Sequence, residues 1–415
     1  MTRALRLSAL ILVLASPTMP GAIQSAARAQ VTAQAQPQMG YQTITSEQAP
    51  AWSRDSAREL LAYIQHIGQE GLNPSDYSPD RLRAAIAGND EAALTQVATP
   101  IFIHLVQDLS GGAVRGQARV EWHMTDVTLD QAGQQRLLAQ VAGGGGVTAA
   151  LDGLLPTHPQ YAGLKRALAN TPASDTARRD LIRTNMERWR WMPRTLGARH
   201  VLVNVPAFTA ALIDDGHVTA RHRAVVGAVR TPTPQLNAQI TAVTINPWWN
   251  VPQSIIRSQG GRFGGGYEVT RSASGGISVR QPPGPRNALG RVKIEMPNQW
   301  AIYLHDTPSQ ALFGRSARAF SHGCIRTQNV RDFAALLLAP TGHWDRADID
   351  RAVETGRNQQ TPLARPVPVY IAYFTAAATS DGDIVTYGDV YGRDAPVRQA
   401  LNHAAAPMQQ ASAAR

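Results

Sequence analysis

The spacing of apolar residues changes from a helical to a strand period part-way along this chain. Within residues 51–170 the apolar positions recur every three or four residues, first at Ala57, Leu60, Leu61, Ile64 and Ile67. This spacing is that of one face of a helix, and Ser53 precedes it as an N-cap. Ser78-Pro79 predicts the start of a second helix. Pro100 predicts the start of a third, which ends at Gly111-Gly112.

A further helix is predicted over residues 174–192, with Ser174 as its cap and a tryptophan-rich end. It joins the helical region to the part of the chain where the period changes. We therefore expect a helical scaffold domain over residues 51–180. We expect its tryptophans, Trp189 and Trp191, to act as packing residues.

From His200 onward the pattern becomes that of short strands separated by Gly, Pro and Asp turns. One helix is predicted among these strands over residues 330–338, with Asn329 as its cap and Asp332 completing a near capping box. The predicted strands cover residues 201–205, 208–213, 218–226, 240–245, 293–296, 301–304, 367–374 and 384–387. Together these elements predict an α+β protein whose β-rich domain, over residues 181–395, is a sandwich or a barrel.

Two segments lack a clear period. Residues 257–285 are rich in Gly and Pro, which predicts either a plain loop or a lid over a site. Residues 396–415 are expected to be a flexible tail, as are residues 30–50 before the first helix.

The N-terminus predicts export. Residues 1–29 combine Arg3 and Arg6 with a short apolar core and an Ala-Arg-Ala cleavage site, so we expect a signal peptide that is cut before Gln30. An uncleaved membrane anchor is the alternative. Cleavage lowers the formal net charge from +10 to +7. Since no other stretch is long enough to span a bilayer, we expect a periplasmic protein without a membrane span, and nucleic acid is a poor explanation of the charge.

The lone cysteine is the first candidate for chemistry. Cys324 is the only Cys of the chain, so it has no disulfide partner within it. It lies in the segment Ser321-His322-Gly323-Cys324-Ile325-Arg326. On a strand, His322, Cys324 and Arg326 share one face. Two cationic groups beside the thiol favour the thiolate, and the amides of Gly323 and Cys324 are candidates for an oxyanion hole.

A thiol nucleophile also needs a base. His305 lies nineteen residues before Cys324, at the end of the predicted strand 301–304. It can move the proton from the thiol to a leaving amine if a third group orients its ring. The Asp306 carboxylate and a backbone carbonyl near it are both candidates for that group. At this stage His322 also stays open as the base.

Two other roles for these residues were weighed. Cys324 can be an inert side chain of a β core, as most free cysteines are. His305, His322 and Cys324 can also be zinc ligands, although their spacing is not that of a closed zinc site.

With the flanking segments included, the sequence resembles the YkuD-type L,D-transpeptidases, and among them the large Gram-negative kind with a helical scaffold domain. The resemblance covers roughly residues 50–395 and rests on the Ser321–Arg326 motif with His305-Asp306-Thr307-Pro308 before it. The other matching segments are Asn185–Trp191, Thr244–Pro252, Gly284–Val292, Tyr373–Ala376 and Asp389–Asp394.

The resemblance implies a peptidoglycan enzyme of cell wall biogenesis that needs no cofactor. Cys324 is implied as the nucleophile, His305 as its base and Gly323 as an oxyanion-hole residue. His322 and Arg326 are implied to hold the substrate, and we also expect substrate contacts from Ser321, Tyr303 and Trp249. The thiolate would attack a tetrapeptide stem, D-Ala would leave, and the amine of a second stem would take the acyl group in a 3→3 cross-link. Carbapenems are expected to acylate such a thiol.

Three other functions stay open. A hydrolase would pass the same acyl-enzyme to water, because the segment 257–285 is short for the lid of this family and lids exclude water. A catalytically idle wall-binding scaffold is the second, and a cysteine protease acting on proteins is the third. Residues 168–181 also leave no room for the small peptidoglycan-binding module that many large members carry. Protein partners are not predictable from the sequence.

Overall fold

The computed structural model describes residues 49–142 and 144–403 of the 415. The predicted signal peptide at 1–29, almost all of the predicted lead at 30–50, and the end of the predicted tail lie outside these residues. Among the described residues, no helix combines the length and the apolar content that crossing a bilayer requires.

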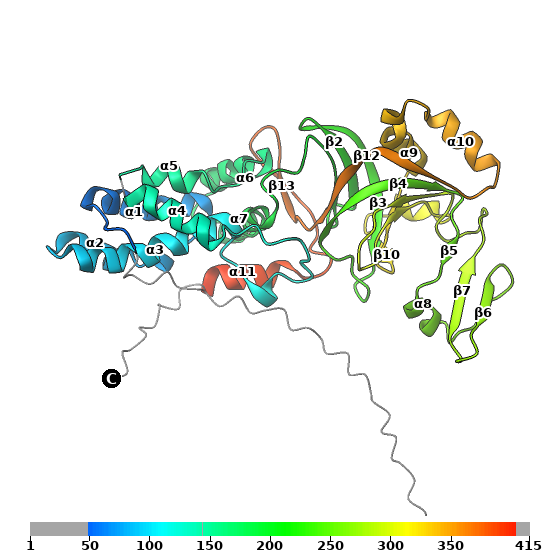
Figure 1. Cartoon of the computed structure of the whole chain (residues 1–415), viewed down its shortest axis with the longest axis horizontal. Coiled ribbons are helices and arrows are strands. Elements are labelled where there is room, and N and C mark those ends of the chain that lie inside the picture. Colours follow the sequence, from blue (N-terminus) through cyan, green and yellow to red (C-terminus); the bar gives the residue numbers. More distant parts are fainter. Residues whose placement is uncertain (1–48, 143, 404–415) are drawn as a thin grey trace, which may run out of the picture. The chain divides into compact units, whose positions relative to one another are not determined.

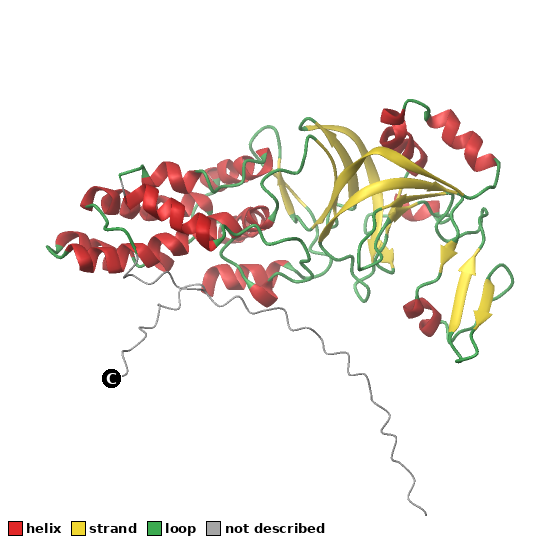
Figure 2. Ribbon diagram, viewed as in Figure 1, coloured by secondary structure: helices red, strands yellow, loops and turns green. Residues whose placement is uncertain are grey.

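The first part of the described chain is helical, as predicted (Figures 1 and 2). Ser53 caps the first helix by accepting a hydrogen bond from the Ser56 amide, and the apolar face around Leu60 and Ile64 is buried. The helices of this part are α1 (Arg54–His66), α2 (Pro79–Ala87), α3 (Glu91–Gly111), α4 (Gln131–Ala142), α5 (Val147–Asp152) and α6 (Pro159–Asn170). They enclose one apolar core of their own.

The start predicted at Pro100 was wrong, because α3 begins nine residues earlier. Asp90 caps it by accepting from the amides of Ala92 and Ala93, and Pro100 lies inside the helix. An interior proline removes one helical hydrogen bond and costs about 3 kcal/mol. The helix continues through it because α3 is buried over most of its surface, with Phe102 and Leu105 fully covered. Tertiary packing outweighs the local preference.

Helix α7 (Thr176–Trp191) crosses the domain border that was predicted between residues 180 and 181. Its cap is Asp175 rather than Ser174. The Asn185 side chain bonds both the amide and the hydroxyl of Thr375, in the segment that follows the last long strand. The helix is therefore built into both parts of the chain, which explains why no sequence break marks a border there.

The tail predicted at 396–415 was wrong at its start. Residues Asp394–His403 form helix α11, whose Val397 and Leu401 are buried in the core of the N-terminal helices. Their spacing of four residues gives one apolar face. Two apolar positions are too few to indicate a helix in the sequence. Residues 404–415 lie outside the described part.

The β-rich part is a sheet of nine strands that closes on itself (Figure 2). The strand order is β10-β3-β11-β9-β8-β4-β12-β1-β2, and β2 pairs with β3 to complete the ring. The strands are β1 (Arg199–Asn204), β2 (Thr209–Asp214), β3 (His217–Gly227), β4 (Leu236–Ile245), β8 (Val292–Glu295), β9 (Leu304–His305), β10 (Ala319–Ser321), β11 (Ile325–Thr327) and β12 (Gln359–Ala372). The fold class expected from the sequence is thus confirmed, with a closed sheet.

Two helices, not one, follow β11. Helix α9 (Val330–Leu338) has the predicted bounds, but Asn329 makes no capping bond and has a positive φ of 52°. The true capping box belongs to α10 (Arg346–Glu354), where Asp345 and Asp348 cap each other's amides. Helix α9 packs Phe333 and Leu337 into the core of the sheet. A small hairpin of β13 (Ala376–Ala378) and β14 (Ile384–Thr386) follows β12.

The Gly- and Pro-rich segment is ordered rather than a plain loop. Together with the residues just before it, it forms helix α8 (Gln253–Ser258) and a separate sheet of β5 (Trp249–Asn250), β7 (Ile277–Gln281) and β6 (Glu268–Arg271) (Figure 1). Val251, Ile256 and Val279 form a small core beneath it. The segment therefore folds with the help of apolar side chains that precede it, Val251 and Ile256, which the segment 257–285 does not itself contain.

Candidate active site

The two predicted reactive segments lie side by side. Strands β9 and β11 pair in parallel, with Leu304 opposite Ile325 and His305 opposite Arg326. Ile325 and Leu304 are completely buried in the core, so the residues before and after them turn to the other face. That face is the one to which Cys324 and His305 belong.

His305 is buried and its ring is fixed by a backbone carbonyl. Its Nδ1 lies 2.5 Å from the carbonyl oxygen of Asp306, and this contact selects one of the two groups that the sequence left open. The Asp306 carboxylate is used elsewhere, accepting from the Arg291 amide and the Gln310 side chain. A carbonyl only accepts, so Nδ1 carries the proton and Nε2 of the neutral ring is a proton acceptor.

His305 also sits between two cations. Lys293 is its cross-strand neighbour on β8, and Arg326 is its neighbour on β11. Burial lowers the pKa of His305 to about 3, and the charges of Arg326 and Lys293 act in the same direction. The imidazole is therefore held neutral, in the form that accepts a proton.

Cys324 is partly exposed, and its surroundings differ in part from the prediction. The cations that act on the thiol are Lys293 and Arg326. Burial is the larger effect and raises the pKa of Cys324, while a hydrogen bond from Tyr303 and the two cations oppose it. Of the two cations expected beside the thiol, Arg326 acts on it as predicted and His322 does not; Lys293 takes the place of His322, and burial outweighs both charges. A thiol of this kind depends on a base.

His322 does not share the face of Cys324 as a strand residue would, because residues 322–324 are a bend between β10 and β11. Its side chain is exposed. The bend is held from inside by Ser321, whose hydroxyl donates to the Cys324 carbonyl at 2.5 Å and accepts from the Gly323 amide at 3.1 Å. Gly323 has a φ of 116°, a conformation that suits only glycine.

The bend affects the predicted oxyanion hole. Since the Gly323 amide already donates to Ser321, it is not free in this structure. None of the hydrogen bonds found among the described residues uses the Cys324 amide. Of the two amides expected from the sequence, that of Cys324 is the one available to a developing oxyanion.

Thr233, in the loop that follows β3, also stabilises the bend. Thr233 is fully buried and donates to the Gly323 carbonyl at 2.7 Å, while accepting from the Gly227 amide at 2.8 Å. Its own amide donates to the Tyr391 hydroxyl. No pattern in the sequence points to Thr233, because its role depends on three segments that meet only in the fold.

Aromatic side chains border the thiol. The Tyr303 ring lies 5.5 Å from that of His305, and the Lys293 ammonium lies 4.6 Å above the Tyr303 ring. Trp249 and Cys324 both act on the Tyr303 hydroxyl through hydrogen bonding, which places the predicted Trp249 and Tyr303 together at the site. Lys293 was missed, although it is one of only two lysines of the chain and lies on a predicted strand.

The zinc alternative finds no cluster to support it. Within residues 49–142 and 144–403, no three His, Cys, Asp or Glu side chains gather closely enough to hold a metal ion. His322 points to solvent while His305 is buried.

Two parts of the chain match known families. Residues 198–371 match the model of the L,D-transpeptidase catalytic domain, YkuD. This region is therefore similar to the YkuD L,D-transpeptidase catalytic domains. Residues 41–168 match the model of the Scaffold domain, which corresponds to helices α1–α6. The YkuD match begins just before β1 and includes His305 and Cys324.

A curated relative is also named as an L,D-transpeptidase. It is a putative L,D-transpeptidase of Haemophilus influenzae, 29% identical over 225 residues. The match covers 48% of this chain and 45% of the relative. The chain thus matches somewhat less than half the length of that protein.

Solved L,D-transpeptidase structures are also among the matches of the chain. One is an L,D-transpeptidase from Mycobacterium smegmatis, at 13% identity and a TM-score of 0.23, covering 42% of this chain and 58% of that one. Another is L,D-transpeptidase 3 from Mycobacterium tuberculosis in complex with a faropenem-derived adduct. It has 13% identity and a TM-score of 0.23, and the match covers 42% of this chain and 60% of that one.

Proposed function

We propose that this protein is a peptidoglycan L,D-transpeptidase that forms 3→3 cross-links through an acyl-enzyme on Cys324. The observation that supports it most is the parallel pairing of β9 with β11, which sets His305 opposite Arg326. Cys324 directly precedes β11, so the thiol lies near His305. The YkuD match over the same strands supports the reaction class.

In the proposed first step His305 takes the thiol proton at Nε2 as the Cys324 sulfur attacks the carbonyl of the third stem residue. A C–S bond forms, the amide C–N bond to D-Ala breaks, and His305 returns the proton to the departing amine. In the second step the side-chain amine of another stem attacks the thioester and gives up a proton to His305. The C–S bond breaks and the thiol is restored.

The role of a neutral histidine follows from its surroundings. Between Lys293 and Arg326 the imidazole resists protonation, so it stays a base in mildly acid conditions. The Asp306 carbonyl holds the ring with Nδ1–H directed away from the reaction. The imidazolium that forms in each step is therefore short-lived, which favours return of the proton to the leaving group.

The charged and polar residues beside the thiol are candidates for binding the substrate. The Arg326 Nε is buried without a partner, and together with Lys293 it supplies positive charge beside the thiol. The Lys293 ammonium is paired with Glu295 at 2.8 Å. We propose that Arg326 faces a stem carboxylate and that the Cys324 amide stabilises the oxyanion. Ser321 shapes the bend, while Trp249, Tyr303 and His322 border the stem.

The proposed substrate lies outside the cytoplasmic membrane, so the proposal includes export by the segment 1–29 and a mature chain that starts at Gln30. The uncleaved anchor is distinguished from it by fractionation of cells followed by mass determination of the protein. A soluble periplasmic protein whose mass begins at Gln30 is expected. A membrane-bound protein of full mass would favour the anchor.

The decisive experiment incubates the mature protein with purified disaccharide-tetrapeptide and analyses products by mass spectrometry, with Cys324→Ala as the matched variant. A dimer that has lost one D-Ala, absent with Cys324→Ala, is expected. Tripeptide without dimer would replace the transpeptidase with the hydrolase. If a folded wild-type protein gives no product and its thiol does not react with a carbapenem, the idle scaffold is the better function.

A further inference from the structure

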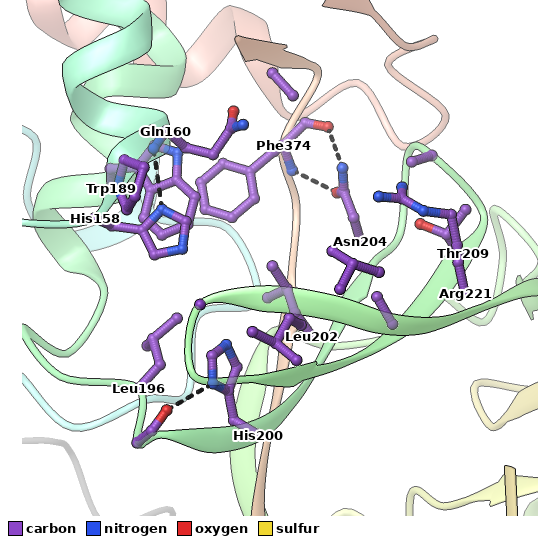
Figure 3. Close-up of a pocket in the computed structure, with 18 of the residues that line it drawn as sticks. His158, Gln160, Trp189, Leu196, His200, Leu202, Asn204, Thr209, Arg221 and Phe374 are labelled. Atoms are coloured by element: carbon purple, nitrogen blue, oxygen red, sulfur yellow. Dashed lines mark hydrogen bonds between the residues drawn. The ribbon is translucent and has the colours of Figure 1, made fainter. Parts of the chain in front are cut away.

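A cavity of about 560 Å³ lies away from the cysteine, between the helices and the outer face of the sheet (Figure 3). Its walls come from the start of α6, the end of α7, and strands β1 and β2. Volumes of this size are typical of sites for small molecules. Most of its lining is apolar, with Leu196, Leu202 and Phe374 among the side chains that face it.

One buried polar atom in this cavity has no partner. His200 is only 5% exposed, and its Nδ1 lies 2.8 Å from the Gly197 carbonyl. That carbonyl can only accept, so Nδ1 carries the proton. Burial lowers the pKa of His200, and the neutral ring then leaves Nε2 as an acceptor, buried and unbonded. Buried polar atoms are usually satisfied, so this atom indicates a missing hydrogen-bond donor.

The second histidine of the cavity has the opposite tautomer. The Nδ1 of His158 accepts from the Gln160 amide at 3.2 Å, so its proton lies on Nε2, which is a donor. Burial, with a smaller effect from His200, lowers the pKa of His158 to about 4. The cavity thus offers one donor and one acceptor from two neutral rings (Figure 3).

The two amide side chains at the walls are already committed. The Gln160 amide group bonds the backbone of Ala378, and that of Asn204 bonds the backbone of Phe374. Trp189 is stacked between His158 and Phe374, so the wall beside the histidines is rigid and apolar. Arg221 and Tyr387 also line the cavity. A group that meets the two histidines and this apolar wall has one N–H or O–H, one acceptor and a small apolar part.

An acetamido group has these three features: an N–H, a carbonyl oxygen and a methyl. We propose that the cavity binds an N-acetylated sugar of the glycan strand, with the sugar N–H donating to His200 Nε2 and its acetyl carbonyl accepting from His158 Nε2. This site lies beyond the proposed function and depends on it only for the choice of polymer. Glycan binding here requires no reaction at Cys324.

The cavity is too far from the thiol to be part of the stem-binding site. Strand β3 borders the cavity at Val218 and Arg221 and reaches the catalytic bend at Gly227. Six residues of strand from Arg221 to Gly227 span about 20 Å. A stem extended over three residues spans only about 10 Å. The sugar held here would therefore belong to a neighbouring repeat, which keeps the polymer attached while a stem reacts.

The test uses chitotetraose, a peptide-free oligomer of N-acetylglucosamine, and the fully deacetylated oligomer as the control ligand. Binding to the whole mature protein is measured by calorimetry, and the imidazole ¹⁵N signals are followed by NMR. His200→Asn keeps a side-chain N–H for the Gly197 carbonyl but removes the Nε2 acceptor. Leu202→Trp fills the cavity. The exposed His343→Asn is the matched histidine control.

We expect the acetylated oligomer to bind and to shift the His158 and His200 signals, with the deacetylated oligomer at least tenfold weaker. His200→Asn should weaken binding about tenfold, Leu202→Trp should abolish it, and His343→Asn should leave it unchanged. Carbapenem acylation of Cys324 should be the same in His200→Asn and the wild type. Absence of binding to folded wild-type protein, equal binding of both oligomers, or binding that His200→Asn does not weaken would each overturn the proposal.

Discussion

The Thr233 hydroxyl donates a 2.7 Å hydrogen bond to the Gly323 carbonyl oxygen, on the peptide that joins Gly323 to Cys324. In a trans peptide the carbonyl and the N–H point in opposite directions. A hydroxyl that holds the carbonyl from inside therefore directs the Cys324 N–H outward, to the side where an oxyanion would form. Thr233 is a positioning residue in this arrangement, because it does not itself touch the substrate.

Replacing Thr233 tests this arrangement. Thr233→Val keeps the side-chain shape but leaves the Gly323 carbonyl and the Gly227 amide without their partner. We expect carbapenem acylation of Cys324 to slow about 100-fold, the size of effect that follows loss or misplacement of an oxyanion donor. Rates are measured by stopped flow and mass spectrometry.

Thr233→Ser is the matched control, since it retains the hydroxyl. Thr233→Ser should keep most of the acylation rate and the KM for the stem substrate. Thr233→Val should lower the kcat for that substrate with little change in KM. If both variants slow acylation equally while remaining folded, the methyl group and its packing matter rather than the hydrogen bond.

Lys293 is expected to tune the thiol. Its positive charge lowers the pKa of Cys324 against the effect of burial, so Lys293→Met should reduce the thiolate fraction at neutral pH. Alkylation by iodoacetamide at pH 7 should slow by about threefold to tenfold, with a smaller difference above pH 10. The other lysine, Lys165, pairs with Glu70 in the helical region. Lys165→Met should leave the alkylation rate unchanged, and an equal effect of both variants would contradict this prediction.

Burial of neutral His305 should make stability depend on acid pH. An unfolded histidine binds its proton near pH 6.5, while the pKa of folded His305 is about 3. Between these values the unfolded state binds more protons, so the free energy of unfolding falls as the pH falls, by about 1.4 kcal/mol per pH unit for this group. His305→Asn should remove that part of the slope.

Urea unfolding at intervals from pH 6 to pH 4 measures this effect. His158, His200 and His222 also have lowered pKa values, so the wild type should show a steeper slope than one group produces. The exposed His343→Asn provides the reference. Identical slopes for His305→Asn and the wild type would show that His305 is not held neutral.

The ion pair within α7 should be costly to break. Arg190 and Glu187 are both fully buried, with 2.6 Å between Nη1 and Oε2, and Arg190 also bonds the Glu70 carbonyl. Arg190→Met leaves Glu187 as an unpaired buried charge, so unfolding should become easier by about 3–5 kcal/mol. Arg58→Met, at the exposed pair with Asp55, should change stability by less than about 1 kcal/mol. Thermal and urea unfolding measure both, and a small effect at Arg190 would contradict the prediction.

Local patterns in the sequence were sufficient for much of the architecture. The cap at Ser53, the hairpin of β2 and β3, and the bounds of α9 each follow from neighbouring residues. The position of His305 at a strand end is of the same kind. These features are local because helix caps, turns and strand alternation depend on residues a few positions apart.

Other features depended on distant contacts. Pro100 inside α3 and the apolar face of α11 are stabilised by burial against helices elsewhere in the chain. The sequence indicated Arg326 but not Lys293 as a source of charge at the thiol, since Lys293 reaches it only through the pairing of β8 with β9. The spacing of residues along the chain does not predict which strands pair in the sheet.

The sequence by itself determined the period of each half, the lone thiol and the histidine nineteen residues before it. Only the tertiary structure decided that the Asp306 carbonyl orients the ring, that Thr233 holds the Gly323 peptide, and that burial raises the pKa of Cys324. The physical reason is the range of the forces involved. Hydrogen-bond geometry and desolvation depend on which atoms surround a group in space, and those atoms come from segments that are far apart along the chain.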